Sequence, residues 1–225
     1  MKDLGDRMKQ NYELRAQHYL TRRTPVIVRV DGRAFHTFTR DFHKPFDQRI
    51  IDSMVMAAMQ VVDETQCKLA YIQSDEASFV LTDYDQLNTD AWFGYNKSKI
   101  ESVTASIMTA AFARCMRLID VTTLAYFDAR AFNIPESEVV NYFLWRAKDW
   151  SSNSVMMLAQ THFSHKELQG KSVPTVFEML RGIGQSWSFL TDAERNGTFL
   201  TCCATFETIE PRYDQIEALW KTVCP

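Results

Sequence analysis

Glycine and proline are scarce in this chain of 225 residues, with 7 and 6 copies spread along its length. No Pro- or Gly-rich linker, low-complexity tract or internal repeat is present, so composition marks no sharp domain boundary. The five cysteines form no CxxC pair, and their odd number fits neither a disulfide framework nor a zinc-ligand pattern. We therefore expect reduced thiols.

Long apolar runs and an excess of one charge are also missing. No window approaches the ~18 consecutive apolar residues of a membrane-spanning helix, and the first residues mix both charges, so we expect no membrane partner and a cytoplasmic location. The net charge of −3 gives no general argument for nucleic-acid binding. Residues 1–49 hold 11 Lys and Arg against 6 Asp and Glu. A surface for RNA or triphosphate would draw on this segment, and an ordinary solvated basic surface is the alternative.

The 46% of hydrophobic residues is ample for a core, and their spacing predicts strands and helices. An opening helix is expected at about 3–20. β-branched residues then predict a strand, and apolar residues repeated at steps of three and four predict two amphipathic helices. The predicted elements are a strand at 25–30, a helix at 46–64, strands at 68–73 and 78–82, a helix at 96–118 and a strand or a bent pair of strands at 122–134.

This βαββαβ order predicts an α+β protein with a ferredoxin-like antiparallel sheet and both helices on one face. We expect residues 1–135 to form this unit together with the opening helix. Residues 136–225 are expected to form a mainly helical C-terminal extension, with helices at 135–148, 151–163 and 174–181 and a mixed tail.

Two carboxylates stand where strands of this fold end. Asp31 follows the first strand, and Asp75 lies at the tip of the hairpin between the next two. In a βαββαβ sheet the first and third strands are neighbours, so these two side chains are expected to approach each other. Paired Mg²⁺ ions need such oxygen ligands, and two ions ~4 Å apart can clamp the attacking and leaving oxygens of phosphoryl transfer. The carbonyl oxygen of Gly32 is a further candidate ligand.

The segment after Asp31 has the features of a phosphate-binding loop. Gly32-Arg33-Ala34-Phe35-His36 offers consecutive backbone N–H groups, which can form a concave nest for phosphate oxygens. Arg33, His36 and Lys44 are nearby cationic or hydrogen-bonding candidates. A plain Asp-Gly turn and a solvated acidic hairpin tip are the ordinary alternatives.

Other features have structural interpretations that we prefer. His162 and His165 are spaced for a metal, but no third ligand is evident, so a structural or RNA-facing role is expected. Trp145 beside Arg146 has the chemistry to stack on a base, although an amphipathic helix that buries its tryptophan is the simpler interpretation.

Two long stretches resemble the signatures of the tRNA-His guanylyltransferase family. They are RVDGRAFHTFTRDFHKPFD at 29–47 and YIQSDEASFVL at 71–81, and similarity continues in WFGYNKSKIESVTAS, FDARAF and YFLWRAKD. The resemblance covers most of residues 25–150. It implies a polymerase-like palm and a nucleotidyltransferase that uses ATP or GTP and two Mg²⁺ ions to add nucleotides to the 5′ end of tRNA. It also implies a homotetramer.

The resemblance carries roles to matching positions. Asp31, the Gly32 carbonyl and Asp75 resemble the metal ligands, with both aspartates catalytic. Residues 31–36 with Ser74-Asp75 resemble the triphosphate-binding loop, and Lys44 and Lys99 match positions associated with the nucleotide or the 5′ end. Glu76 lies in the signature without an assigned role.

One departure from the family bears on the substrate. Enzymes that add an extra G to tRNA-His carry HINNLYN after WRAKD, whereas this chain has SSNSVMM at 151–157 and keeps only Asn153. The chain is therefore similar to the guanylyltransferase-like branch, which repairs 5′-truncated tRNA by template-dependent 3′-to-5′ addition. The alternatives are G addition to tRNA-His, a nucleotide cyclase that lacks the GGDEF string, and an inactive RNA-binding module.

Overall fold

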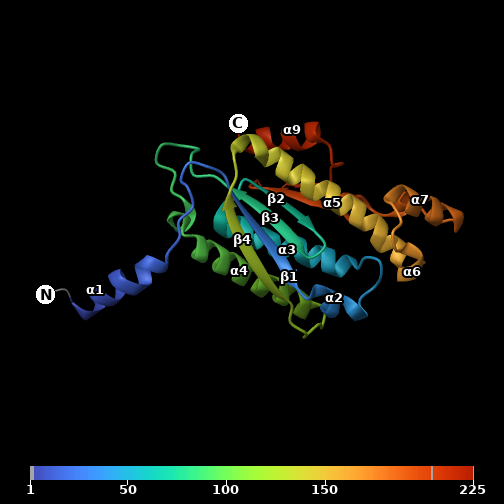
Figure 1. The fold of residues 1–225 in the computed structure, drawn as a ribbon, viewed down its shortest axis with the longest axis horizontal. Helices are drawn as coiled ribbons and strands as arrows, with labels where there is room; N and C mark the ends of the chain where they lie inside the picture. Colours follow the sequence, from blue (N-terminus) through green and yellow to red (C-terminus); the bar gives the residue numbers. More distant parts are fainter. Residues whose placement is uncertain (1–2, 204, 225) are drawn as a thin grey trace.

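A computed structural model describes residues 3–203 and 205–224 and confirms the predicted βαββαβ order. Every predicted element of this unit is present within a few residues of its expected limits (Figure 1). The six elements are β1 (Val26–Arg33), α3 (Gln48–Thr65), β2 (Leu69–Gln73), β3 (Glu76–Leu81), α4 (Lys97–Leu118) and β4 (Tyr126–Asn133).

The strands form one antiparallel sheet in the order β4-β1-β3-β2-β5-β6. The first four positions are the ferredoxin-like arrangement, with β1 and β3 adjacent at the centre. β5 (Thr198–Thr201) pairs with β2, and β6 (Phe206–Glu207) pairs with β5. The tail, for which a mixed structure is predicted, thus extends the sheet. Strands from both sides of residue 135 share it, and a domain boundary at that residue stays a prediction.

Helices cover both faces of the sheet. α3 and α4 pack on one face over a core that includes Val28, Phe79 and Phe112, and each begins with a side-chain cap, Asp47 for α3 and Asn96 for α4. On the other face, α5 (Val139–Gln160) and α9 (Tyr213–Val223) close a second core over the sheet. Because side chains alternate along β1, Asp31 lies on the α5 face.

The C-terminal helices differ from the prediction in one respect. The helices expected at 135–148 and 151–163 are a single helix, α5, which runs through Ser151 and Ser152. The second half of α5 packs with α7 (Val173–Gly182), close to the predicted helix at 174–181, and with α6 (His165–Leu168) in a third apolar cluster. α8 (Asp192–Asn196) leads into β5.

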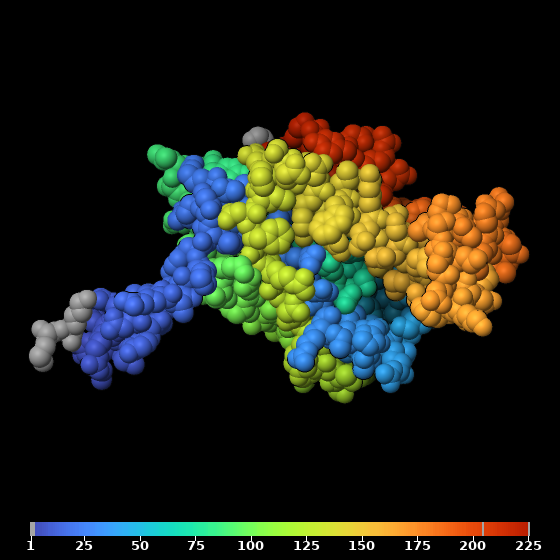
Figure 2. Space-filling model, in the orientation of Figure 1, coloured from blue at the N-terminus to red at the C-terminus, as the bar shows by residue number. Residues whose placement is uncertain are grey.

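The opening helix extends away from the body of the molecule (Figures 1 and 2). α1 (Leu4–Met8) continues as a π-helical turn, η1 (Lys9–Glu13), and a 3₁₀ turn, η2 (Leu14–Ala16), and none of these residues is buried. In the described part of the chain, no helix combines the length and apolar character needed to cross a membrane. The remaining short helices are α2 (Phe35–Phe38), η3 (Thr39–Asp41), η4 (Trp92–Tyr95), η5 (Glu136–Glu138) and η6 (Trp187–Phe189).

Candidate active site

The end of β1 and the tip of the β2–β3 hairpin meet as the topology predicts. The backbone N–H of Gly32 donates a hydrogen bond to the carbonyl oxygen of Asp75, at 3.0 Å. In the strand register Asp31 lies opposite Glu76 on β3 and opposite Asp128 on β4. The chain therefore gathers acidic side chains at one end of the sheet, with Asp31 and Asp75 on neighbouring segments.

The close approach of the β1 end to the hairpin tip requires a glycine at position 32. A Cβ atom at this position would lie 2.6 Å from Cδ2 of Phe35 and 2.9 Å from Cβ of Asp75. Real Cβ atoms do not come so close, and Phe35 is buried in the core, so neither neighbour can easily withdraw. The absence of a side chain at Gly32 lets the two carboxylate-bearing segments touch.

Burial and a neighbouring charge both act on Asp75. Loss of solvent raises the pKa of this carboxyl above its ordinary value, and the negative charge of Asp31 raises it further. Both effects disfavour the ionised form. A bound cation would relieve the repulsion between Asp31 and Asp75.

The residues at this site fit Mg²⁺ bound together with a phosphate-bearing substrate. Within residues 3–203 and 205–224, no three His, Cys, Asp or Glu side chains gather closely enough to hold one ion. Mg²⁺ is commonly bound by one or two carboxylates, with substrate phosphates and water completing its shell, so Asp31 and Asp75 suffice. Arg130 lies 3.8 Å from the Asp31 carboxylate and 3.6 Å from that of Asp128, which partly balances the charge.

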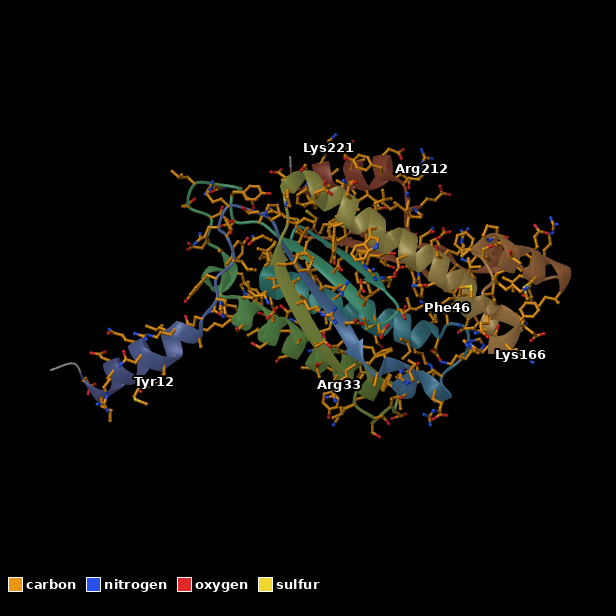
Figure 3. The ribbon with its side chains drawn as sticks, viewed as in Figure 1. Tyr12, Arg33, Phe46, Lys166, Arg212 and Lys221 are labelled. Carbon is orange, nitrogen blue, oxygen red and sulfur yellow. The ribbon has the colours of Figure 1, made fainter. Side chains whose placement is uncertain are left out.

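A cavity of about 860 Å³ opens beside the two carboxylates. Its polar wall comes from the segment after β1 and from the hairpin tip, and its apolar wall comes from the start of α3. Figure 2 shows a hollow between α5 and the segment after β1, and Figure 3 shows Phe46 between that segment and α5. The predicted site residues that line it are Gly32, Ala34, Phe35, His36, Lys44, Ser74 and Asp75.

A second cavity of about 350 Å³ adjoins the first and includes Asp31. It shares Ser74, Asp75 and Trp150 with the larger cavity, so Asp75 stands where the two meet. Asn153 also lines it, together with Met156 and Met157. The SSNSVMM stretch therefore lies at the carboxylates.

Two turns beside the carboxylates use strained backbone. Ala34 has a φ of 50° and Ser74 a φ of 47°, in the left-handed region that residues with a side chain rarely adopt. Such strain is typical of ligand sites. His36 and Lys44 are both exposed, and the Lys44 Nζ donates to the Thr39 carbonyl at 2.8 Å.

Two predicted residues lie outside both cavities. Arg33 is exposed and extends beyond the end of β1 (Figure 3). Lys99 lies in the first turn of α4, where its Nζ is 5.7 Å from the Phe93 ring centroid. Thr109, ten residues later, accepts a bond from Phe127, which lies opposite Gly32. Lys99 therefore lies ~15 Å along the axis of α4 from Thr109, which is at the Gly32 end of the sheet. Its role with the nucleotide stays a prediction.

Arg146 is the site residue that the sequence analysis missed. Its Nε and Nη2 both donate to the carboxylate of Glu76 at 2.7 Å, and its Nη1 lies 3.3 Å from Asp149. Glu76 and Arg146 are both nearly buried. This pair joins α5 to the hairpin that carries Asp75 and gives Glu76 a structural role. The only sign of this pair in the sequence is an acidic residue in YIQSDEASFVL and a basic residue in YFLWRAKD, two of the stretches that resemble the family.

The chain matches the family model described as tRNAHis guanylyltransferase over residues 5–135, more than half of its length. The chain belongs to the tRNAHis guanylyltransferase family. It is 36% identical over 139 residues to the tRNA(His) guanylyltransferase of Schizosaccharomyces pombe. The aligned region covers 59% of this chain and 51% of that protein. The match to the first curated relatives spans about half to just under two thirds of their lengths.

Solved structures from the family extend the similarity over the whole chain. A bacterial tRNA(His) guanylyltransferase-like protein in complex with ATP has a TM-score of 0.92 and 38% identity, with 99% of this chain and 100% of that chain covered. A bacterial guanylyltransferase-like protein in complex with GTP has a TM-score of 0.74 and 39% identity, with 89% and 84% covered. The family is one of nucleotidyltransferases, and the ferredoxin-like sheet with its helices is the fold of this member.

Proposed function

We propose that this protein adds nucleotides to the 5′ end of truncated tRNA in the 3′-to-5′ direction, guided by the opposite strand of the acceptor stem. The observation that carries the proposal is the meeting of Asp31 and Asp75 at the edge of a cavity large enough for a nucleotide. Family membership supplies the reaction class, nucleotidyl transfer.

The larger cavity is proposed to take ATP or GTP. Backbone N–H groups of Ala34, Phe35 and His36, with Ser74 and Lys44, are placed for the triphosphate, because these residues line the end of the cavity next to Asp75. Ile50, Met54 and other apolar residues at the opposite wall suit the base. The bacterial structures with ATP and with GTP support both nucleotides as ligands.

Asp31, Asp75 and the carbonyl of Gly32 are proposed to hold two Mg²⁺ ions with the triphosphate. When bound, these ions would lower the pKa of the attacking hydroxyl and stabilise the leaving pyrophosphate. The residues of the chain position the reactants: the two carboxylates fix the cation-binding position, the loop after β1 orients the phosphates, and the apolar wall excludes water.

The choice of repair over G addition rests on the SSNSVMM stretch. Asn153, Met156 and Met157 line the cavity that includes Asp31, so the residues that replace the HINNLYN motif lie at the site itself. Methionine side chains offer no donors to recognise a particular base. Selection of the incoming nucleotide then depends on pairing with the template. Addition of an extra G to tRNA-His is the second candidate, favoured by the names of the curated relatives.

A homotetramer in the cytoplasm completes the proposal. Leu4, Met8, Tyr12 and Leu14 are exposed on the projecting segment, an apolar surface that a second copy of the chain would cover. Size-exclusion chromatography with light scattering tests the assembly. A monomer at micromolar concentration would contradict it.

The direct experiment is incubation of a 5′-truncated tRNA with Mg²⁺ and each nucleoside triphosphate in turn. We expect extension of the RNA by the wild-type protein and none by Asp75→Asn. Absence of extension with all four nucleotides by a folded wild-type protein would overturn the proposal.

A further inference from the structure

Trp145 is exposed, contrary to the expectation that helix α5 buries it. It is 54% exposed, although it lies on α5 between Tyr142 and Arg146, which are both buried. The Arg146 guanidinium carbon is 4.6 Å from the Trp145 ring centroid, and the Tyr142 ring meets the indole edge-on at 5.9 Å. The indole is thus fixed by two neighbours while much of its surface faces solvent.

The sheet beside Trp145 is also uncovered. β4 is an edge strand, and its residues that share the α5 face are all exposed, namely Tyr126, Asp128, Arg130 and Phe132. Phe132 contacts the Tyr142 ring at 6.0 Å, so aromatic rings continue from β4 to Trp145. Figure 1 shows β4 and α5 together on the face turned to the viewer.

This surface adjoins the carboxylates on the side away from the larger cavity. Arg146, the next residue of α5, and Trp150, in the following turn, line the smaller cavity with Asp31. Along α5 the two cavities share Trp150 and Met157, but only the smaller one reaches Arg146. A nucleotide in the larger cavity leaves the β4 side as the open approach to Asp31 for the other reactant.

We propose that Trp145 stacks on the terminal base pair or unpaired base at the 5′ end of the RNA, which lies over the exposed face of β4. This inference rests on the proposed function, since it names the surface that receives the RNA of that reaction. Stacking on an indole tolerates every base, as a repair enzyme requires.

The charge of the surface favours RNA over an apolar protein partner. Arg130 on β4 is half exposed, and Arg29 lies directly opposite it on β1. The Arg29 Nε has no hydrogen-bond partner among the described residues. Arg130 also lies near the carboxylates of Asp31 and Asp128, so Arg29 is the arginine whose charge a phosphate of the RNA would balance. Aromatic rings interleaved with arginine are typical of surfaces that bind single strands and nucleic-acid ends.

The test uses an acceptor-stem RNA with 2-aminopurine as its 5′-terminal base. Stacking on an indole quenches the fluorescence of this base, so we expect quenching when wild-type protein binds. Trp145→Ala should remove the quenching and weaken RNA binding roughly 5- to 150-fold. Trp145→Phe should retain part of both. Tyr213→Ala, which removes an exposed aromatic ring from α9, is the matched control and should change neither.

Each outcome has one meaning. ATP affinity and the melting temperature of the Trp145 variants report whether the fold and the nucleotide pocket remain intact. RNA binding with quenching that is unchanged in Trp145→Ala would overturn the stacking role. Loss of stability without loss of quenching would show that Trp145 only covers the Arg146–Glu76 pair. Failure of wild-type protein to bind any RNA would count against the proposed function itself.

Discussion

The amide of Gly32 donates to the carbonyl oxygen of Asp75, and this hydrogen bond joins the end of β1 to the tip of the β2–β3 hairpin. It brings two segments 43 positions apart in the sequence into contact and sets the approach of the Asp31 and Asp75 side chains. The site therefore depends on a backbone contact as well as on carboxylates.

Gly32→Ala tests this contact. The added methyl would overlap Phe35 and the Asp75 side chain, so we expect a loss of ~1–3 kcal/mol in the free energy of unfolding and a large loss of activity. Urea denaturation measures the first effect. Gly182→Ala is the control, because no atom lies within 4 Å of its Cβ position, and it should be near neutral. Equal effects of the two substitutions would contradict the account.

Asp31→Asn and Asp75→Asn should each reduce the rate of nucleotide addition ~10³-fold or more, because each removes a proposed cation ligand. The fold should remain, since Asp31 is partly exposed and burial already disfavours the charge of Asp75. Asp63→Asn, at an exposed position on α3, is the control. Near-normal rates in either site variant would show the assignment to be wrong.

The same site predicts the metal requirement. Oxygen ligands select Mg²⁺ or Mn²⁺, so EDTA should abolish addition and either ion should restore it. Activity that survives EDTA, or that needs Zn²⁺, would contradict the assignment.

The Glu76–Arg146 pair predicts a coupled effect on stability. Glu76→Gln removes the two-pronged ionic partner of a buried guanidinium and leaves only Asp149 beside it, so it should cost about 1.5–3 kcal/mol in the free energy of unfolding. The double variant Glu76→Leu, Arg146→Met removes both charges and should recover most of that loss. Asp214→Asn, which breaks an exposed pair with Arg212, should cost at most about 1 kcal/mol. A double variant less stable than Glu76→Gln would contradict this account.

Asp47 predicts a pH dependence of stability. The pKa of this carboxyl is lowered to about 2, chiefly by hydrogen bonds from the Arg49 side chain. The backbone N–H groups of His43 and Arg49 also contribute. Because the folded pKa lies below the unfolded one, the stabilisation is complete above about pH 4 and is lost as the pH falls towards 2. The stability difference between wild type and Asp47→Asn should therefore shrink across this range. A difference independent of pH would exclude this origin.

The sequence was sufficient to predict the ferredoxin-like order because each of its elements has a strong periodicity. The same order placed Asp31 beside Asp75, because the first and third strands of such a sheet are neighbours. β5 was missed since TFLT is four residues long and becomes a strand only by pairing with β2. The break expected near Ser151 was wrong because burial of Trp150 and Ser154 holds α5 together there.

Local sequence patterns could not predict contacts between residues that are far apart in the chain. Glu76 and Arg146 are 70 positions apart, and nothing in either stretch indicates that they meet. The exposure of Trp145 depends on β4 being an edge strand that α5 does not cover, which periodicity along α5 alone could not show.

The most direct measurement is a competition between a tRNA that lacks its first 5′ nucleotide and a full-length tRNA-His. The base opposite the gap is varied through all four identities, and the nucleotide added is sequenced. A mispaired nucleotide would leave hydrogen bonds unmade at about 1–3 kcal/mol for each group, so the template should dictate the choice. We predict preferential extension of the truncated RNA by the complementary nucleotide at every template. Exclusive addition of G whatever the template would contradict repair and establish G addition instead.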